Sequence, residues 1–316
     1  MSNKKIIIRI SNEIGNQLFM YASAFAIAKK LDRILIVDNE TAYKSRKNIS
    51  KYGLNNFKIS SNIASKKYKF LGFAGYIKRK ILKTFDKFKK NKKFFIEIKD
   101  EKKITRFNNE ILSYKFSDTV YLEGYFETQK YFIDYENEIR EEFKFIDSKK
   151  YINSPFYNEI IKDNSVAICI RQNRFIEGFG KSKKANNIEK SNNFTSEQVA
   201  YINKSIDYFK KKIESPIFYL WSNNYSNLDQ NLFNEKINKV VHSDDFISNI
   251  DKRLLDLFLI SQSKNHIVIP SSFNWWGAWL SNKKNKIILR PSDSFFSEFA
   301  LNNKDFWPSD WVVINE

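Results

Sequence analysis

The sequence predicts a two-lobed α/β protein in which two Rossmann-like halves face an interlobe cleft. At the N-terminus, a short apolar strand, a helix-like run and a second apolar strand follow one another. From Ser165 onward, five apolar strands alternate with helix-like segments. Such alternation is typical of parallel sheets covered by helices. We therefore expect a first lobe over residues 1–160 and a second lobe over residues 161–316.

The first lobe opens with a βαβ pattern. We expect strands at 4–10 and 33–37, a turn at 11–16 and a helix at 17–31. Gly15 in the turn has no Cβ, so it can take a left-handed conformation and allow another group to approach closely. Asn16 is placed to cap the helix, although an ordinary helix start would explain both residues. A single glycine is not a nucleotide-binding fingerprint, and residues 40–160 show no clear order of elements.

The second lobe is more regular. We expect strands at 166–171, 216–221, 237–243, 265–270 and 286–291, helices at 195–213 and 251–263, and a turn into a helix at 271–281. Thr195 and Gln198 have the spacing of a capping box. Trp275, Trp276 and Trp279 are expected to anchor the core rather than to stack on a ligand. Ligands of open α/β sheets bind beyond the carboxyl ends of the strands, so the loops after the strands are the expected ligand-binding loops.

Two of these loops carry groups suited to a diphosphate. Arg171 ends its strand, and a guanidinium presents a fork of donors that matches phosphate. Arg174 follows three residues later. Ser271 and Ser272 begin a helix, where hydroxyls and free backbone N–H groups favour an anion. Taken singly, these residues are also explained by a surface ion pair or by simple helix capping.

The composition limits the classes of function. The net charge is +18, but no nucleic-acid recognition motif accompanies it and lysine is abundant throughout the chain, so we expect no nucleic-acid partner. Cys169 is the single cysteine, which excludes an internal disulfide and fits a reducing compartment. His242 and His266 lie 24 residues apart, which argues against a His-rich or Cys-rich zinc site. We read no signal peptide, and no apolar run approaches the roughly 20 residues of a membrane span.

Residues 66–93 form a strongly basic segment. The segment holds twelve Lys and Arg residues and one acid, Asp86. Its apolar residues recur at steps of three and four, which predicts one face of a helix: Phe70, Phe73, Ile77, Ile81, Phe85 and Phe88. A basic amphipathic helix of this kind can lie on an anionic membrane. Alternatively, the apolar face packs on the protein and the lysines are solvated.

Three stretches resemble one family, the bacterial α-1,2-fucosyltransferases of glycosyltransferase family 11. Residues 14–31 (IGNQLFMYASAFAIAKKL) resemble its opening GxGNQLFQYAxAxxLA, and residues 254–280 (LLDLFLISQSKNHIVIPSSFNWWGAWL) resemble its DLxLMSxCKHxIIxxSSFSWWxAWL. Residues 302–314 (NNKDFWPSDWVVI) are similar to its usual ending. The resemblance implies a GT-B-like, inverting transferase that moves L-fucose from GDP-fucose to a galactoside hydroxyl, with no metal or other cofactor. The lack of an Asp-x-Asp pair is consistent with the last point.

The resemblance also implies roles for particular residues. Arg171 would contact the donor diphosphate, and Asn16 would lie near the reacting sugar. The remaining expected donor-site residues are Gly15, Arg174, Asp256, Ser271, Ser272 and Phe273. In the family pattern HxRRxD the first arginine is retained as Arg171, whereas Cys169, Gln172 and Arg174 replace His, Arg and Asp. This departure bears on the identity of the donor, and Arg174 is a candidate to replace the second arginine.

Several alternatives stay open at this stage. Glu13, Asp38 and Glu177 follow strands and are candidates for the base that deprotonates the acceptor hydroxyl. Asp256 binds the guanine or ribose, or is a solvated helix residue. The chain is a transferase of another nucleotide sugar, or else a basic membrane-binding or nucleic-acid-binding protein. The resemblance favours a cytoplasmic enzyme at the inner membrane face, acting on a galactose-containing glycan such as the O-antigen of lipopolysaccharide.

Overall fold

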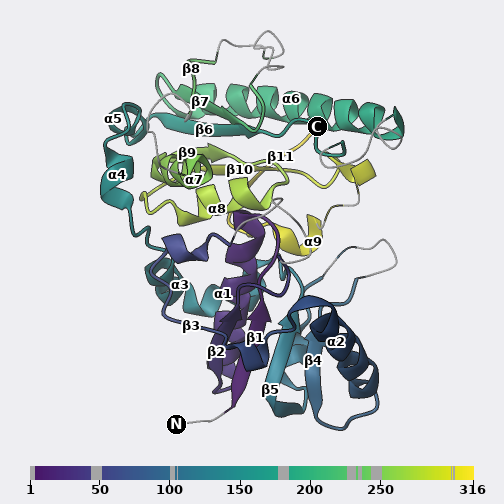
Figure 1. The fold of residues 1–316 in the computed structure, drawn as a ribbon. Helices are drawn as coiled ribbons and strands as arrows, with labels where there is room; N and C mark the ends of the chain where they lie inside the picture. Colours follow the sequence, from purple (N-terminus) through teal and green to yellow (C-terminus); the bar gives the residue numbers. More distant parts are fainter. Residues whose placement is uncertain are drawn as a thin grey trace. The chain divides into compact units, whose positions relative to one another are not determined.

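The computed structural model describes residues 4–43, 52–99, 104, 106–176, 185–225, 233, 237–242, 251–299, 301 and 303–316. The chain divides into two compact units, and each unit contains its own sheet (Figure 1). The first unit comprises Met1–Ile146 with Asn302–Pro308, and the second comprises Asp147–Leu301 with Ser309–Glu316. The boundary between them falls at Ile146, compared with residue 160 in the expectation from the sequence.

The first unit has a five-stranded sheet in the order β3-β2-β1-β5-β4, and all its strand pairs are parallel. Its strands are β1 (Lys5–Arg9), β2 (Ile34–Asp38), β3 (Asn62–Ile63), β4 (Lys92–Ile96) and β5 (Phe116–Glu123). Its helices are α1 (Ile14–Lys30), α2 (Gly72–Asp86), α3 (Glu136–Glu142) and α9 (Asn303–Phe306). Short 3₁₀ turns lie at Leu54–Asn56, Lys66–Tyr68, Asn109–Leu112, Gln129–Tyr131 and Ile133–Tyr135. The expected βαβ start is confirmed, and β1 is the central strand.

Helix α1 is buried almost all round. Among Ile14–Ala28, only Asn16 is partly exposed, because the alanines of this helix let neighbouring elements approach closely. The helix starts at Ile14, three residues earlier than expected, so the prediction that Asn16 caps it is wrong and Glu13 is the N-cap residue. The left-handed residue is Asn12, with φ of 63°, and not Gly15. An asparagine tolerates this conformation, so the turn needs no glycine.

The second unit has a six-stranded sheet in the order β11-β10-β9-β6-β7-β8, again with parallel pairs throughout. Its strands are β6 (Ser165–Ile170), β7 (Ile217–Ser222), β8 (Lys239–Val240), β9 (Asn265–Ile267), β10 (Ile288–Pro291) and β11 (Val312–Ile314). Its helices are α4 (Ser148–Ile152), α5 (Tyr157–Ile160), α6 (Ala185–Lys212), α7 (Lys252–Gln262) and α8 (Ser272–Leu280), with a 3₁₀ turn at Ser297–Phe299. The five expected strands are present, and the sequence analysis missed β11, which has only three residues.

Helix α6 corrects one sequence prediction. It spans Ala185–Lys212 and so begins ten residues before the expected start at Thr195. The Thr195 hydroxyl donates to the Ser191 carbonyl oxygen at 3.1 Å within the helix, so Thr195 and Gln198 do not form a capping box. The polar first part of α6 concealed the helix, because Asn and Ser have low helix propensity.

The core of the second unit surrounds β6. Val166, Ile168 and Ile170 belong to one hydrophobic cluster with residues of α6, including Tyr201 and Phe209. The tryptophans of α8 are buried as expected, with Trp275 and Trp276 fully inaccessible and Trp279 nearly so. The packing of β6 against α6 fixes the position of the strand and of the loop that follows it.

Candidate functional site

The second unit has a topological switch point beside β6. The chain leaves β6 for β7 and β8 on one side and later enters β9 on the other side. Because both neighbours pair with β6 in parallel, the carboxyl ends of β6 and β9 lie together. Arg171 and Arg174 follow β6, and Ser271 and Ser272 follow β9. In open α/β sheets, the crevice at such a switch point is where ligands bind.

Two side-chain amides hold the backbone at the tip of β6. Gln198 of α6 is fully buried, accepts a hydrogen bond from the Arg171 N–H and donates one to the Arg171 carbonyl, both at 2.9 Å. Asn223, just after β7, accepts from the Gln172 N–H at 2.8 Å and donates to the Gln172 carbonyl at 3.1 Å. The next residue, Asn173, takes a left-handed φ of 59°. The backbone that carries Arg171 is thus held by its neighbours, whatever the arginine side chain contacts.

Arg174 links the loop after β6 to the loop after β9. Its Nη1 donates to the Pro270 carbonyl oxygen at 2.6 Å. The guanidinium carbon lies 4.9 Å from the ring centroid of Phe194 and 5.8 Å from that of Phe175. Cation–π contacts at such distances are favourable. The arginine that stands in place of the family's aspartate therefore brings a positive charge to the residue that precedes Ser271.

Helix α8 starts without a capping hydrogen bond from the Ser271 side chain, although Ser271 is its N-cap residue. The amide oxygen of Asn274 instead accepts from the Ile269 N–H at 2.8 Å and so fixes the turn into the helix. Asn274 is buried, whereas Ser271, Ser272 and Phe273 are half-buried. Simple capping by Ser271 is therefore not observed.

Cys169 and Asp256 lie close together near the end of β6. Cys169 is buried, and its burial together with the nearby Asp256 carboxylate raises the pKa of the thiol, which therefore stays neutral. Asp256 belongs to α7 and is half-buried. Side chains alternate along a strand, so the alternation predicts that Arg171 emerges on the same side as Cys169. The group that replaces the family's histidine is thus a neutral core residue.

The first unit has a corresponding switch point between β1 and β5. The chain leaves β1 for β2 and β3 on one side, and β5 pairs with β1 on the other. The amide of Asn12, after β1, donates to the hydroxyl of Tyr125, after β5. The Asn16 amide donates to Oε1 of Glu127 at 2.6 Å. Sequence reasoning found Asn16 but missed Tyr125 and Glu127, because they follow a strand in the segment whose elements showed no clear order.

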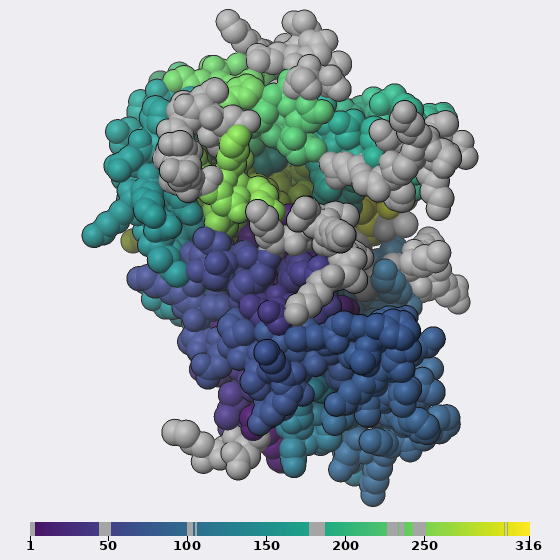
Figure 2. Space-filling model, in the orientation of Figure 1, coloured from purple at the N-terminus to yellow at the C-terminus, as the bar shows by residue number. Residues whose placement is uncertain are grey.

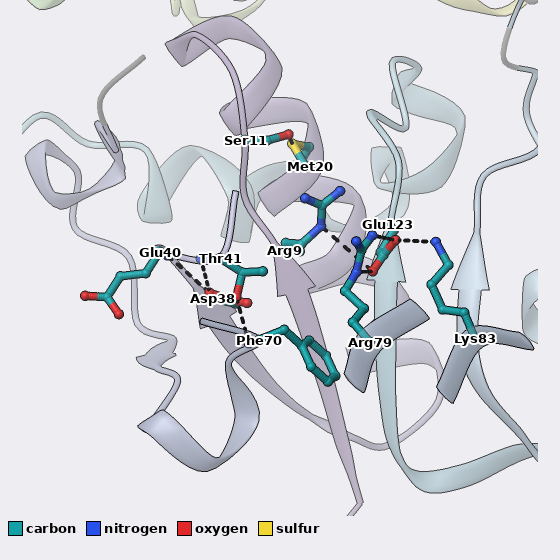
Figure 3. Close-up of polar contacts among 10 residues, drawn as sticks. All are labelled: Arg9, Ser11, Met20, Asp38, Glu40, Thr41, Phe70, Arg79, Lys83 and Glu123. Atoms are coloured by element: carbon teal, nitrogen blue, oxygen red, sulfur yellow. Dashed lines mark hydrogen bonds and ion pairs between the residues drawn. The ribbon is translucent and has the colours of Figure 1, made fainter. Parts of the chain in front are cut away.

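A buried carboxylate pairs with three cations at the end of β5 (Figure 3). Glu123 is 5% exposed, and it accepts hydrogen bonds from Nε and Nη2 of Arg79 and from Nζ of Lys83 at 3.0 Å. Arg9 Nε lies 3.8 Å from Oε1 of Glu123. Burial acts to raise the pKa of Glu123, but the hydrogen bond from Arg79 and the charge of Arg9 outweigh it, so the pKa lies below its ordinary value. Three cations thus surround one ionised carboxylate.

The structure describes two of the three candidate bases. Asp38 is 1% exposed, and its Oδ1 accepts the backbone N–H groups of Glu40 at 3.1 Å and Thr41 at 3.0 Å (Figure 3). This arrangement suits a residue that holds the turn after β2. Glu13 is exposed and precedes α1. Glu177 lies outside the described residues.

Within the part of the chain that the structure describes, neither histidine belongs to a cluster of potential metal ligands. His266 is buried, and burial lowers the pKa of its imidazole to about 3. The His242 ring lies on Tyr225, with the ring centroids 3.8 Å apart. Over the described ranges, no group of three or more His, Cys, Asp or Glu side chains is arranged to hold a metal ion. None of the helices in those ranges combines the length and the hydrophobicity that crossing a membrane requires.

Two Rossmann-like units with parallel sheets are the architecture of GT-B-like glycosyltransferases, as expected from the sequence. The chain belongs to glycosyl transferase family 11, whose family model matches residues 2–315. The protein is therefore a glycosyltransferase.

Two Escherichia coli proteins are similar to the chain over nearly its whole length. One is an alpha-1,2-colitosyltransferase, 26% identical over 316 residues that cover 98% of this chain and 99% of the relative. The other is the O-antigen biosynthesis glycosyltransferase WbnK, 24% identical over 328 residues that cover 96% and 98%. Among solved structures, an Arabidopsis thaliana FUT1 variant in complex with GDP has a TM-score of 0.51 at 11% identity. That match covers 96% of this chain and 74% of the plant protein, and it supports the fold alone.

The contacts of Gln198 predict that its amide stabilises the tip of β6. Replacing Gln198 by Ala removes both of its hydrogen bonds to the partly buried backbone of Arg171, so we expect a loss of about 2 kcal/mol in the free energy of unfolding. We also expect faster hydrogen exchange at the Arg171 amide. Asn193→Ala, at an exposed position of the same helix, is the control and should leave both quantities nearly unchanged. Wild-type exchange at Arg171 in the Gln198 variant would contradict this assignment.

The lowered pKa of Glu123 predicts a dependence of stability on pH. Its contribution is complete above the unfolded-state pKa of about 4.3 and is lost as the pH falls through the lower pKa of the folded state. Glu123→Gln removes the carboxylate that the three cations share and should cost roughly 3 kcal/mol at neutral pH. The variant should also lose less stability on acidification than the wild type.

Urea unfolding at several pH values measures both effects of the Glu123 substitution. Glu138→Gln on the exposed side of α3 serves as the control, with an expected change of about 0.5 kcal/mol or less. Parallel stability curves for the wild type and the Glu123 variant across the acid range would show that this carboxylate is not responsible.

Proposed function

We propose that the protein transfers L-fucose from GDP-fucose to a galactoside hydroxyl, with inversion and formation of an α-1,2 linkage. Membership of family 11 supports sugar transfer. The name of one relative, alpha-1,2-colitosyltransferase, supports the linkage, and that of WbnK supports a role in the synthesis of bacterial O-antigen. The observation that carries the proposal is the switch point beside β6, where Arg174 links the loop of Arg171 to the start of α8.

The chemistry of the leaving group explains why cations belong at this position. Breaking the bond between sugar and phosphate leaves an additional negative charge on GDP. Preorganised donors that meet this charge in a site shielded from water lower the barrier. We assign this role to Arg171, with the hydroxyls of Ser271 and Ser272 and the N–H groups of the first turn of α8. In this proposal these groups supply the stabilisation, and the reaction needs no divalent metal.

The other donor-site residues have distinct proposed roles. Arg174 holds the two loops together and adds positive potential, which is compatible with its contacts to Pro270 and Phe194. Asp256 is proposed to bind the guanine or the ribose, and Phe273 to line the donor pocket beside Ser272. The second unit is thus the proposed nucleotide-sugar-binding lobe.

The first unit is the proposed acceptor-side lobe. Asn16 is assigned a position near the reacting sugar, and its hydrogen bond to Glu127 would fix its amide. Gly15, in the first turn of helix α1, has no Cβ and would allow close approach of the donor. Glu13, which is exposed, and Glu127 are the candidates for the base that takes the proton of the acceptor hydroxyl. We place the reaction in the cytoplasm, at the inner face of the membrane, on a galactose-containing glycan.

Removing the Arg171 guanidinium should abolish most transfer without unfolding the protein. We expect Arg171→Ala to lower kcat by about 10²–10³, because the charge of the departing GDP loses a preorganised donor, whereas its backbone contacts to Gln198 remain. Arg33→Ala, at the amino end of β2 in the other unit, removes the same charge and should retain activity. Rates close to those of the wild type in a folded Arg171 variant would refute the assignment.

A donor panel tests the proposed reaction as a whole. Purified protein is incubated with GDP-fucose, GDP-mannose, UDP-sugars or a nucleotide-activated colitose, together with a set of galactosides, with and without a chelator. We expect turnover of GDP-fucose, an α-1,2-linked product and no effect of the chelator. Turnover of another donor only would overturn the assigned donor, and loss of activity with chelator would overturn the role given to the protein cations.

A further inference from the structure

Helix α2 exposes an apolar stripe because polar contacts hold its opposite side to the sheet. Arg79 and Lys83 bind Glu123 at the end of β5. The Asp86 carboxylate accepts the backbone N–H groups of Lys93 at 2.7 Å and Phe94 at 2.9 Å, at the start of β4. These contacts fix the rotation of α2 about its axis.

The residues on the opposite side of α2 point away from the sheet. Side chains four residues apart share a face of a helix, and the outward set, here called the α2 stripe, is Phe73, Ile77, Ile81, Phe85 and Phe88, the last just beyond the helix end. Phe73 is 80% exposed and Phe88 is 85% exposed.

Phe70, which the sequence analysis grouped with the stripe, precedes the helix and is buried. Of the two alternatives for this apolar face, packing on the protein is therefore not observed for the stripe itself. Contiguous exposed apolar surface of this kind marks an interaction site.

Lysines border the α2 stripe. Lys78, Lys80, Lys87, Lys89 and Lys90 are all exposed, and none of them has an ion-pair partner among the described residues. Asp86, the one acid of residues 66–93, is buried and bound to backbone N–H groups. The exposed side of α2 is thus apolar in the middle and cationic at its borders. Figure 2 is coloured by residue number, and the blue part of the chain, which includes α2, lies on the face that is shown.

A groove beside α2 adds to the positive charge. It has a volume of about 630 Å³ and lies between α2 and β4. Its lining includes five cationic side chains (Arg79, Lys80, Lys83, Lys87 and Lys92), one acid (Asp86) and the rings of Tyr76, Phe94 and Tyr114. Arg79 and Lys83 are paired with Glu123, so Lys80, Lys87 and Lys92 supply the excess positive charge. A groove that combines cations with aromatic rings suits a phosphate group attached to an apolar body.

We propose that α2 binds an anionic phospholipid membrane, with the α2 stripe inserted at the level of the headgroups and the lysines on lipid phosphates. The combination of exposed apolar side chains and exposed lysines favours a membrane over the other partners. A nucleic acid would use the lysines but would leave five large apolar side chains exposed, whereas a neutral apolar partner would leave the lysines uncompensated. A basic amphipathic helix in the plane of the interface satisfies both sets of groups. This contact is independent of the reaction that the enzyme catalyses.

Sedimentation with vesicles tests the proposal on the full chain, without donor or acceptor. We expect the wild type to bind vesicles of phosphatidylcholine and phosphatidylglycerol and to bind phosphatidylcholine vesicles far more weakly. Replacing Lys87, Lys89 and Lys90 by Ser should weaken binding about a hundredfold, since each lysine near the surface contributes roughly a factor of five. Replacing Phe73 and Phe88 by Ser should weaken it about tenfold or more. Both sets of side chains are exposed, so folding should be unaffected.

Matched variants separate this surface from the general charge of the protein. Lys210, Lys211 and Lys212 are exposed lysines that end α6, and replacing them by Ser removes the same charge from the other unit. Ile152→Ser with Ile188→Ser removes exposed apolar side chains elsewhere. Equal losses in the α2 and α6 lysine variants would overturn the proposal. So would unchanged binding in the phenylalanine variant, or a wild-type dimer that Phe73→Ser dissociates.

Discussion

Parallel pairing of β6 with both β7 and β9 is the constraint on which the candidate site depends. It brings the ends of β6 and β9 together, although the residues that follow these strands are separated by about a hundred positions in the chain. Parallel strands expose their last backbone groups at one edge, and those groups need partners. Here the amides of Gln198 and Asn223 provide them for Arg171 and Gln172. The cationic tip is thereby part of the hydrogen-bonded framework of the sheet.

The departures from the family pattern make physical sense in this framework. The Arg174 guanidinium lies over the Phe194 ring and donates a hydrogen bond to the Pro270 carbonyl oxygen. An aspartate could make neither contact. Cys169 lies in a buried position where burial and Asp256 keep its thiol neutral. Compared with the family pattern, the region around Arg171 has a cation, Arg174, in place of an aspartate, and a neutral side chain, Cys169, in place of a histidine.

In the first unit, charged side chains rather than amides bind the groups at the ends of the strands. Glu123, at the end of β5, forms ion pairs with Arg9, Arg79 and Lys83. The Asp86 carboxylate accepts a backbone hydrogen bond from β4 and so holds the far end of α2 to that strand. Helix α2 therefore turns its polar anchors and Leu82 toward the sheet and the α2 stripe outward, whereas amphipathic helices of globular proteins usually bury their apolar face. Removing one partner of such a buried ion pair would leave an uncompensated charge, so Arg79 and Lys83 keep their side of α2 at the sheet.

Local signals were sufficient for the alternation of strands and helices, the first βαβ unit, the strand that precedes Arg171 and the helix that starts at Ser272. Hydrophobic periodicity and turn residues act over only a few positions, so the sequence reveals them directly. They failed at α6, whose first turns are polar, and at Asn12, which takes the left-handed conformation expected of Gly15. They also could not show that Gln198 holds Arg171, that Asn16 meets Glu127, or which side of α2 faces the sheet. The sequence by itself determined the fold class and the family, and it predicted which residues are suited to a diphosphate. Only the tertiary structure decided which of them are neighbours, because contacts between residues a hundred positions apart are set by strand order and by the pairing of buried polar groups.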